Sequence, residues 1–273
     1  NDNDQIAFDL VAESLSRRII PVNRNEIPAE AEVVTAFVDV QKELLFYTLM
    51  AWTPGGRGVV IDYGTFPDQE THYFSKSKLR RKMSELPGSV DQSTDTYHGL
   101  EAIADDLFNR ALYRADGATL GLQMMAVDAG YSESAAAVRR YCTESGYRGM
   151  IHPSIGKYIG ANQLPWQQFT QGKRDQMGVH CRLQAPKSRS FGARELLIDT
   201  NWWKTWAAER LISPVGSDQA IALFEAEPHL HRMFAEHCTA EDPTITIGKT
   251  GTNVCEWKQN PGKPNNDYWD CLV

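Results

Sequence analysis

Three aspartates that lie far apart in the chain could together bind divalent cations. Asp39 lies near the end of an apolar, β-branched run, Asp128 ends a second apolar run, and Asp270 lies in the last segment. Carboxylates held close together repel one another unless cations bind between them. Oxygen-only ligation suits Mg²⁺ or Mn²⁺. Two such ions about 4 Å apart stabilise the attacking and the leaving oxygen in phosphodiester cleavage.

Each aspartate also has a plainer explanation when it is taken alone. A single Asp can be a helix cap, a turn residue or a surface charge. Asp267 lies three residues before Asp270, so a helix at this position can point both side chains the same way. The combination is more informative than any one residue, and it depends on whether the fold brings the carboxylates together.

A β-meander is expected to position the first aspartate. Three apolar runs, at 33–41, 44–52 and 58–63, are separated by short turn-rich gaps, which predicts three consecutive strands. An Asp inside the first strand is costly to bury without a partner. Asp39 is therefore either satisfied by hydrogen bonds or faces a cation site.

A strand–helix–strand unit is expected to position Asp128. The unit comprises a strand, a helix and a second strand at 120–128, 133–144 and 149–153. Ser132 is the predicted N-cap of the helix, and the two strands are expected to be parallel. If strand 33–41 is a parallel neighbour, Asp39 and Asp128 lie side by side. Strand-end carboxylates beside a change of strand direction are typical of sites in α/β sheets.

Other elements follow from apolar spacing and from turn signals. Helices are expected at 6–18, 97–115, 202–211, 228–241 and 267–273. Further strands are expected at 179–183, 195–198, 220–224 and 255–257. Residues 156–177 are rich in Gly and Gln and indicate a loop or lid. The tryptophans of the 202–211 helix are interpreted as packing anchors rather than base-stacking groups.

Composition limits the class of protein. The chain has 273 residues, of which 42% are apolar, and its 7 Trp support a real core. A net charge of −7 argues against a strongly basic nucleic-acid binder but not against a local basic face. No apolar run approaches the roughly 18–20 residues of a membrane span, and the polar first ten residues do not resemble a signal peptide. The five scattered cysteines are interpreted as reduced thiols.

Two groups of basic residues could contact phosphate. The first group is Lys76, Lys78, Arg80, Arg81 and Lys82, and the second is Lys187, Arg189 and Arg194, at the tip of the hairpin predicted between 179 and 198. For the first group a solvated loop or helix is the favoured interpretation, and a phosphate-contacting role is the alternative. Such contacts would make DNA binding depend steeply on salt.

Two further patterns are dismissed. Residues 248–250 imitate the end of a phosphate-binding loop, but Pro243 stands where that motif needs Gly. The set His231, His237 and Cys238 could suggest metal ligands, but a gap of six residues puts the two histidines on different helical faces.

These residues together resemble a known family. The element order, with Asp in the first strand, Asp ending the fourth and Asp in the last helix, resembles the ribonuclease H-like nuclease fold. More narrowly, the chain is similar to the nuclease domain of the large terminase subunit of lambda-like tailed phages. The matching pieces are FVDVQ at 37–41, IDYG at 61–64, VDAGY at 127–131, AE at 240–241 and NDYWDC at 266–271.

The resemblance implies a fold and an activity. The fold is α/β, with a mixed central sheet in which a three-strand antiparallel meander is joined by parallel strands and flanked by helices. The activity is metal-dependent cleavage of concatemeric double-stranded DNA during genome packaging, with two Mg²⁺ or Mn²⁺ ions. The residues that match the family's acidic positions are Asp39, Asp128 and Asp270. Asp267 stands where the family often has His or Glu, so it could ligate or only lie beside the site.

The resemblance also implies supporting residues, partners and location. The residues expected to support the ligands are Asp62, Glu241 and Asn266. Residues 1–32 are expected to lead in from an ATPase domain that is not in this chain, and residues 33–273 to form the nuclease domain. Expected partners are double-stranded DNA, the terminase small subunit, the portal and that ATPase domain, in the host cytoplasm and not at a membrane.

Two other functions stay open. The chain could be a different nuclease on the same fold, such as a junction resolvase or an enzyme that cuts RNA/DNA hybrids. It could also be a DNA-binding or packaging-assembly module whose acidic residues are structural.

Overall fold

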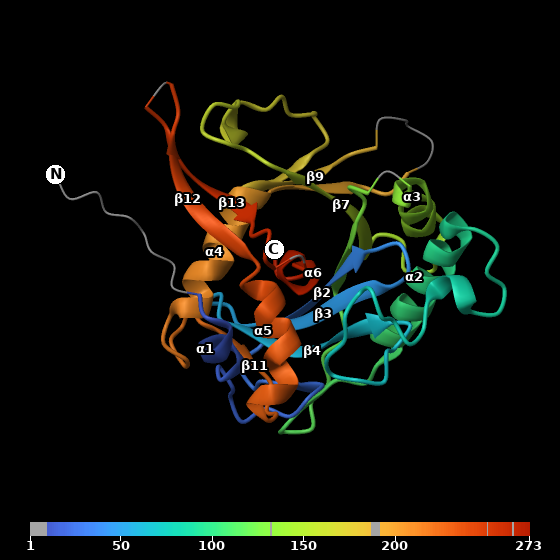
Figure 1. Cartoon of the computed structure of the whole chain (residues 1–273). Coiled ribbons are helices and arrows are strands. Elements are labelled where there is room, and N and C mark those ends of the chain that lie inside the picture. The colour runs from blue at the N-terminus through green and yellow to red at the C-terminus, as the bar shows by residue number, and fades with distance from the viewer. Residues whose placement is uncertain (1–9, 132, 187–191, 250, 264) are drawn as a thin grey trace.

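A mixed β-sheet forms the centre of the protein (Figure 1). The structure, a computed structural model, describes residues 10–131, 133–186, 192–249, 251–263 and 265–273. Within these residues the sheet has nine strands, in the order β11-β4-β3-β2-β6-β7-β10-β9-β8. The strands are β2 (Val33–Val40), β3 (Leu45–Trp52), β4 (Gly58–Phe66), β6 (Met124–Asp128), β7 (Ile151–Lys157), β8 (Gln176–Gly178), β9 (Cys181–Gln184), β10 (Glu195–Asp199) and β11 (Ile221–Leu223).

The strand directions confirm the predicted sheet. Strands β2, β3 and β4 are successive antiparallel neighbours, as the three apolar runs predicted. Strand β2 is parallel to β6, β6 to β7 and β7 to β10. The strand–helix–strand unit is therefore present, and its first strand lies directly beside the meander. This arrangement brings the ends of β2 and β6 together.

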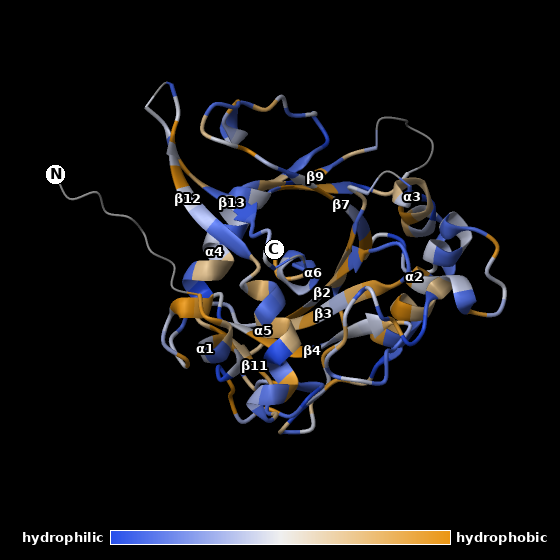
Figure 2. Ribbon diagram, viewed as in Figure 1, coloured by the Kyte–Doolittle hydropathy of each residue, from blue (hydrophilic) through white to orange (hydrophobic). Residues whose placement is uncertain are grey.

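Helices cover both faces of the sheet. They are α1 (Ala12–Ser16), α2 (Gln92–Asn109), α3 (Ala135–Glu144), α4 (Thr200–Ile212), α5 (Arg232–Cys238) and α6 (Asp267–Asp270), with short 3₁₀ helices η1 (Met83–Glu85), η2 (Trp166–Gln168) and η3 (Pro228–His231). One hydrophobic cluster joins α2 and α3 to the sheet, and a second joins α1, α4, α5 and α6 to it. Figure 2 shows the central strands largely in the apolar colour and the peripheral loops largely in the polar one.

Two small sheets complete the fold. Strands β1 (Glu26–Ile27) and β5 (Tyr113–Arg114) form a short parallel pair. Strands β12 (Glu241–Ile247) and β13 (Asn253–Gln259) form an antiparallel hairpin, which projects from the body beside α4 in Figure 1. Helix α1 packs against α5, so the described part of the lead-in segment contacts the same body as the rest of the chain.

Several predicted element boundaries are wrong. The helix expected at 97–115 is α2, which begins earlier because the Asp91 side chain accepts a hydrogen bond from the Thr94 backbone N–H and caps it. The helix expected at 228–241 ends at Cys238, and Glu241 begins β12 instead. Residues alternate in polarity along β12, which is typical of a strand. The prediction extended the helix over the first residue of this strand.

Some predicted features lie outside the described residues. These are the N-cap Ser132, the basic residues Lys187 and Arg189, Thr250, and residues 6–9 of the first expected helix. Among the described helices, none has the length and apolar character needed to cross a bilayer.

Candidate metal centre

Asp39 and Asp128 lie side by side on neighbouring strands. The last paired residues of β2 and β6 are Val38 and Val127, and the two aspartates are the next residues along each chain. Asp39 is 5% exposed. Gly130 N donates a hydrogen bond of 2.9 Å to Asp128 Oδ1 and fixes that carboxylate at the strand end. The expected pairing of the two carboxylates is thus present in the sheet.

Helix α6 is packed against the strand that neighbours Asp39. Phe46 of β3 is the antiparallel partner of Asp39. The Tyr268 and Phe46 rings pack edge to face, with 5.1 Å between their centroids. Cys271 Sγ lies 3.7 Å from the Phe46 carbonyl oxygen. Trp269 is fully buried in the same cluster. These contacts fix α6 over the end of β2 (Figure 1).

The carboxylates of α6 therefore lie close to Asp39. Burial raises the pKa of Asp39 well above its usual value, and the negative charges of Asp270, Asp267 and Asp128 raise it further. Burial also raises the pKa of Asp128. Four aspartates from two strands and one helix thus converge, and their mutual repulsion disfavours the fully ionised state.

A buried lysine holds one part of this cluster. Lys204 of α4 is 8% exposed, and its Nζ donates to Glu241 Oε1 and, at 2.9 Å, to Asp270 Oδ1. Asn266 Nδ2 donates to the same two carboxylates, at 2.8 Å to Glu241 and 2.9 Å to Asp270. Burial raises the pKa of Asp270 despite the lowering effect of the Lys204 charge.

Three more side chains lie against Asp267 and Asp39. Lys76 Nζ lies 2.8 Å from Asp267 Oδ1, and Gln41 Nε2 donates to Asp39 Oδ2 at 2.7 Å. His237 Nδ1 lies 3.5 Å from Asp267 Oδ2. Burial lowers the pKa of His237 to about 4, so the imidazole is neutral at pH 7 and supplies no positive charge.

The donor set fits hard divalent cations. Five carboxyl groups meet two lysine ammonium groups here, which leaves an excess of negative charge that cations would offset. Asp267 Oδ2 is buried and has no hydrogen-bond partner among the described residues. Within those residues, no three His, Cys, Asp or Glu side chains are already arranged to hold one ion. Lys204 and Lys76 now contact Asp270 and Asp267, two of the carboxylates that could bind an ion.

Asp62 belongs to a different network. Arg24 Nε donates to Asp62 Oδ1 at 2.6 Å, and Tyr47 Oη donates to Oδ2 at 3.1 Å. Arg110 Nη1 also binds Oδ2. The structure thus brings Glu241 to Asp270 but gives Asp62 a set of partners of its own.

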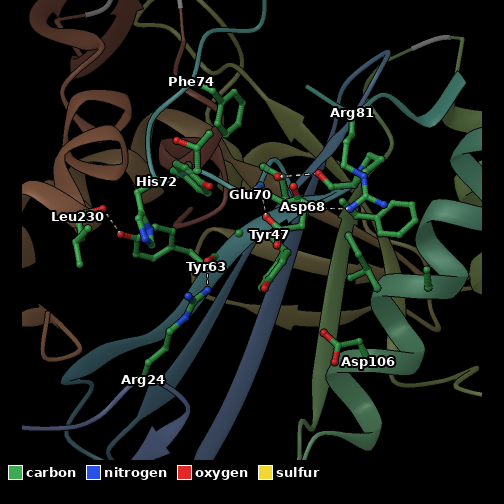
Figure 3. A pocket seen from close by; sticks show the side chains of 18 of the residues that line it. Arg24, Tyr47, Tyr63, Asp68, Glu70, His72, Phe74, Arg81, Asp106 and Leu230 are labelled. Carbon is green, nitrogen blue, oxygen red and sulfur yellow. Dashed lines mark hydrogen bonds and ion pairs between the residues drawn. The ribbon is translucent and has the colours of Figure 1, made fainter. Parts of the chain in front are cut away.

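A cavity lies beside the Asp62 network. Its volume is about 880 Å³, and Arg24, Tyr47, Tyr63 and Asp106 line it (Figure 3). Its described lining includes Tyr268 of α6 and none of the aspartates of the predicted site. The aspartates predicted to bind metal therefore lie outside the described lining of this cavity.

The described basic residues occupy different positions. Lys76 reaches Asp267, whereas Lys78, Arg80 and Arg81 are exposed on the loop before η1. Lys82 pairs with Glu85 at 3.1 Å. Arg194 lies directly before β10, and its guanidinium donates to the Arg174 carbonyl. Their role in DNA binding stays a prediction.

Sequence reasoning missed Lys204 and Gln41. Lys204 lies within the NWWKTW stretch of α4, where only the tryptophans were interpreted, as packing anchors. A lysine with aromatic residues on both sides was the available signal. Gln41 follows Asp39 by two residues, so side-chain alternation puts both on one face of the extended chain.

The dismissed histidine set does not form a cluster. Tyr63 Oη lies 2.9 Å from His231 Nδ1, and the Phe224 carbonyl lies 3.1 Å from His231 Nε2. Burial lowers the pKa of His231 to about 4. His231 is thus held by polar partners in the core, apart from His237 and Asp267.

Comparison with known proteins gives one family and one similar structure. Residues 4–273 match a protein-family model described as the endonuclease domain of the terminase large subunit gpA. No curated protein matches. Among solved structures, the chain is similar to a mutant nuclease domain of the large terminase subunit gp2 of the bacterial virus Sf6 with manganese. The identity is 13% and the TM-score 0.46, over 89% of this chain and 87% of that chain.

Proposed function

The chain belongs to the family of terminase large subunit gpA endonuclease domains, and from this membership we propose that it is a divalent-metal-dependent endonuclease. Its proposed substrate is concatemeric double-stranded DNA, which it cuts during packaging of a phage genome. The observation that carries the proposal is the convergence of Asp39, Asp128 and Asp270 from two parallel strands and a helix.

The three aspartates have distinct proposed roles. Asp39 lies between Asp128 and the α6 carboxylates, so it would hold the ions together with both. Asp128 and Asp270 would each contribute a carboxylate to hold the ions, and Asp267 is positioned to assist. Bound Mg²⁺ or Mn²⁺ supplies the charge that stabilises the attacking and leaving oxygens of a phosphodiester.

Other residues support these ligands. Glu241 and Asn266 hold Asp270 through the Lys204 network. Lys76 lies at the edge of the cluster, 30% exposed, where it could pass from Asp267 to a phosphate of the DNA. Lys78, Arg80, Arg81, Lys82 and Arg194 are proposed to contact the backbone, as are Lys187 and Arg189, which lie outside the described residues.

The proposed setting is the packaging machinery in the host cytoplasm. The domain is acidic overall, so we expect weak DNA binding when it is isolated, because its own charge repels phosphate. The remaining DNA-binding affinity would come from an ATPase motor upstream, the small subunit and the portal.

A nicking assay on supercoiled plasmid with Mn²⁺ tests the proposal. We expect nicking by the wild type and a loss of more than about 100-fold in Asp39→Asn, because changes to residues that only support a ligand already cost 10–100-fold. Asp116→Asn is the matched control, since Asp116 is an exposed turn residue. Undiminished nicking by Asp39→Asn would rule out the metal assignment.

Substrate comparison separates the remaining alternatives. Preference for a four-way junction or an RNA/DNA hybrid over plasmid would indicate a different nuclease on this fold. DNA binding without nicking, and without Mn²⁺ binding in calorimetry, would indicate a structural module.

A further inference from the structure

Ser154 lies in the same row of the sheet as the two strand aspartates. Asp128 of β6 pairs in register with Ser154 of β7, and Asp39 lies beside Asp128 on the other side. Side chains at the same level of adjacent strands point to the same face of a sheet. The three residues therefore face the same side, in the order Asp39, Asp128, Ser154.

The Ser154 hydroxyl is buried and lacks a partner. Ser154 is 1% exposed, and its Oγ has no hydrogen-bond partner among the described residues. Such a hydroxyl destabilises the folded state, because it loses its hydrogen bonds to water and gains none. Packing alone would be served better by Ala at this position, and among such hydroxyls Ser154 is the one in register with Asp128.

Asp128 is the ionisable neighbour that this hydroxyl can reach. Adjacent strands are about 4.8 Å apart, so rotation about the Ser154 side-chain bond can carry Oγ toward the Asp128 carboxylate. Asp128 is already held on one side by Gly130 N at Oδ1. A second donor on the β7 side would fix the plane of the carboxylate.

We propose that Ser154 is a positioning residue of the metal centre, whose hydroxyl donates to the Asp128 carboxylate when a divalent cation is bound. The inference rests on the proposed function, because it assumes that Asp128 is a metal ligand. Hydrogen bonds to ligating carboxylates orient them and raise metal affinity, and their loss typically costs 10–100-fold in affinity. Ser154 acts through Asp128 and does not itself touch the ion.

The inference predicts opposite effects of Ser154→Ala with and without metal. In EDTA the variant should be at least as stable as the wild type, because it removes an unpaired buried hydroxyl. In Mn²⁺ titrations its affinity should fall by about tenfold to a hundredfold. A residue that only packs the sheet would not produce this combination.

Calorimetric titration with Mn²⁺, together with thermal unfolding in EDTA, tests the inference. Ser154→Thr keeps the hydroxyl and should restore most of the affinity, and Ser154→Cys keeps the volume if the Ala variant fails to fold, with an expected affinity below that of the wild type. Thr96→Val is the matched control, since Thr96 is another buried hydroxyl without a partner among the described residues, on α2. Its Mn²⁺ affinity should equal that of the wild type.

The outcomes separate this inference from the proposed function. Wild-type affinity in both Ser154→Ala and Ser154→Cys would overturn the role of Ser154 and leave the metal centre standing. A wild-type protein that binds no Mn²⁺ would overturn the metal centre itself. Equal loss of affinity in Thr96→Val would show that any buried substitution has this effect, and would overturn the inference.

Discussion

Asp39 is a buried acid among other acids. Its pKa is raised first by burial and then by the charges of Asp270 and Asp267. The folded protein without metal therefore binds a proton at Asp39 at pH values where the unfolded chain has released it. The contribution of Asp39 to the free energy of unfolding therefore depends on pH. It falls as the pH rises from the unfolded pKa of about 3.9 through the raised folded pKa, because over this range the unfolded chain has lost a proton that the folded protein still binds.

Asp39→Asn should change the pH dependence of stability without metal. We expect the variant to be more stable than the wild type at pH 7.5 in EDTA, and the difference to shrink toward pH 4. The size of the difference at pH 7.5 should be about 1.4 kcal/mol for each unit by which folding raises the pKa of Asp39. The low pKa of His231 and His237 acts in the opposite sense in both proteins, so it cancels in the difference. Urea unfolding at several pH values measures this, and a constant difference would contradict it.

Lys204 shows the complementary case of a buried cation between carboxylates. Lys204→Met leaves Glu241 and Asp270 without their shared counter-ion, and removing one partner of a buried ion pair typically costs about 3–5 kcal/mol. We expect this loss in EDTA and a smaller loss in Mn²⁺, because a bound cation can replace the ammonium charge. Lys157→Met, at an exposed position, is the control. An equal loss with and without Mn²⁺ would contradict the competition between lysine and metal.

At the scale of elements, the β12–β13 hairpin is fixed to the loop that follows β7. Ala161 N donates to Glu256 Oε1 at 3.0 Å, and Lys249 N donates to Asn162 Oδ1 at 3.0 Å. Gly248 allows this approach, because a Cβ there would lie 2.1 Å from the Ala161 carbonyl oxygen. The hairpin begins at Glu241, so its position bears on the Lys204 network.

Gly248→Ala should separate the hairpin from this loop. We expect destabilisation of about 1–3 kcal/mol, the usual cost of forcing extra atoms into a packed contact, and faster hydrogen exchange at Ala161 N. Gly121→Ala is the control, because a Cβ there meets nothing within 4 Å. Unchanged exchange at Ala161 N would show that the contact is not needed to hold the hairpin.

At the scale of the whole molecule, metal binding should stabilise the fold. The carboxylates come from β2, β6 and α6, which are distant in sequence, so only the folded chain can bring them to one ion. A ligand that binds only the folded state adds about 2.7 kcal/mol at one hundred times its dissociation constant. For a chain of this size that is a rise of about 5–10 °C in melting temperature. Differential scanning calorimetry with and without Mn²⁺ checks it, and no shift would contradict a site built from these three elements.

DNA binding by the whole domain should depend steeply on salt. Each phosphate contact contributes about −0.9 to the slope of log affinity against log salt. We expect the double variant Lys78→Ala/Arg80→Ala to reduce the magnitude of that slope by about 2. Arg17→Ala, at an exposed arginine directly after α1, should leave the slope unchanged. An unchanged slope in the double variant would show that Lys78 and Arg80 do not contact the DNA phosphates.

The sequence alone determined the elements with strong local signals. Apolar runs of strand length fixed β2, β3 and β4, and the strand followed by a helix and a second strand fixed β6 and β7, because alternation and length are local properties. The aspartates at the ends of these runs were visible for the same reason. Element boundaries failed where a side-chain cap or a tertiary contact decided them, as at Asp91 and Glu241.

Only the tertiary structure decided what surrounds the carboxylates. Ser154 carries no local signal, and the aromatic neighbours of Lys204 do not say which carboxylates it meets, because a serine in a strand and a lysine in a helix are ordinary surface residues until packing buries them. Asp62 lies within one of the predicted strands, as Asp39 does, yet the fold pairs it with Arg24 and Arg110. Charge compensation depends on which side chains meet across long sequence separations, and the spacing of residues along a chain does not contain that information.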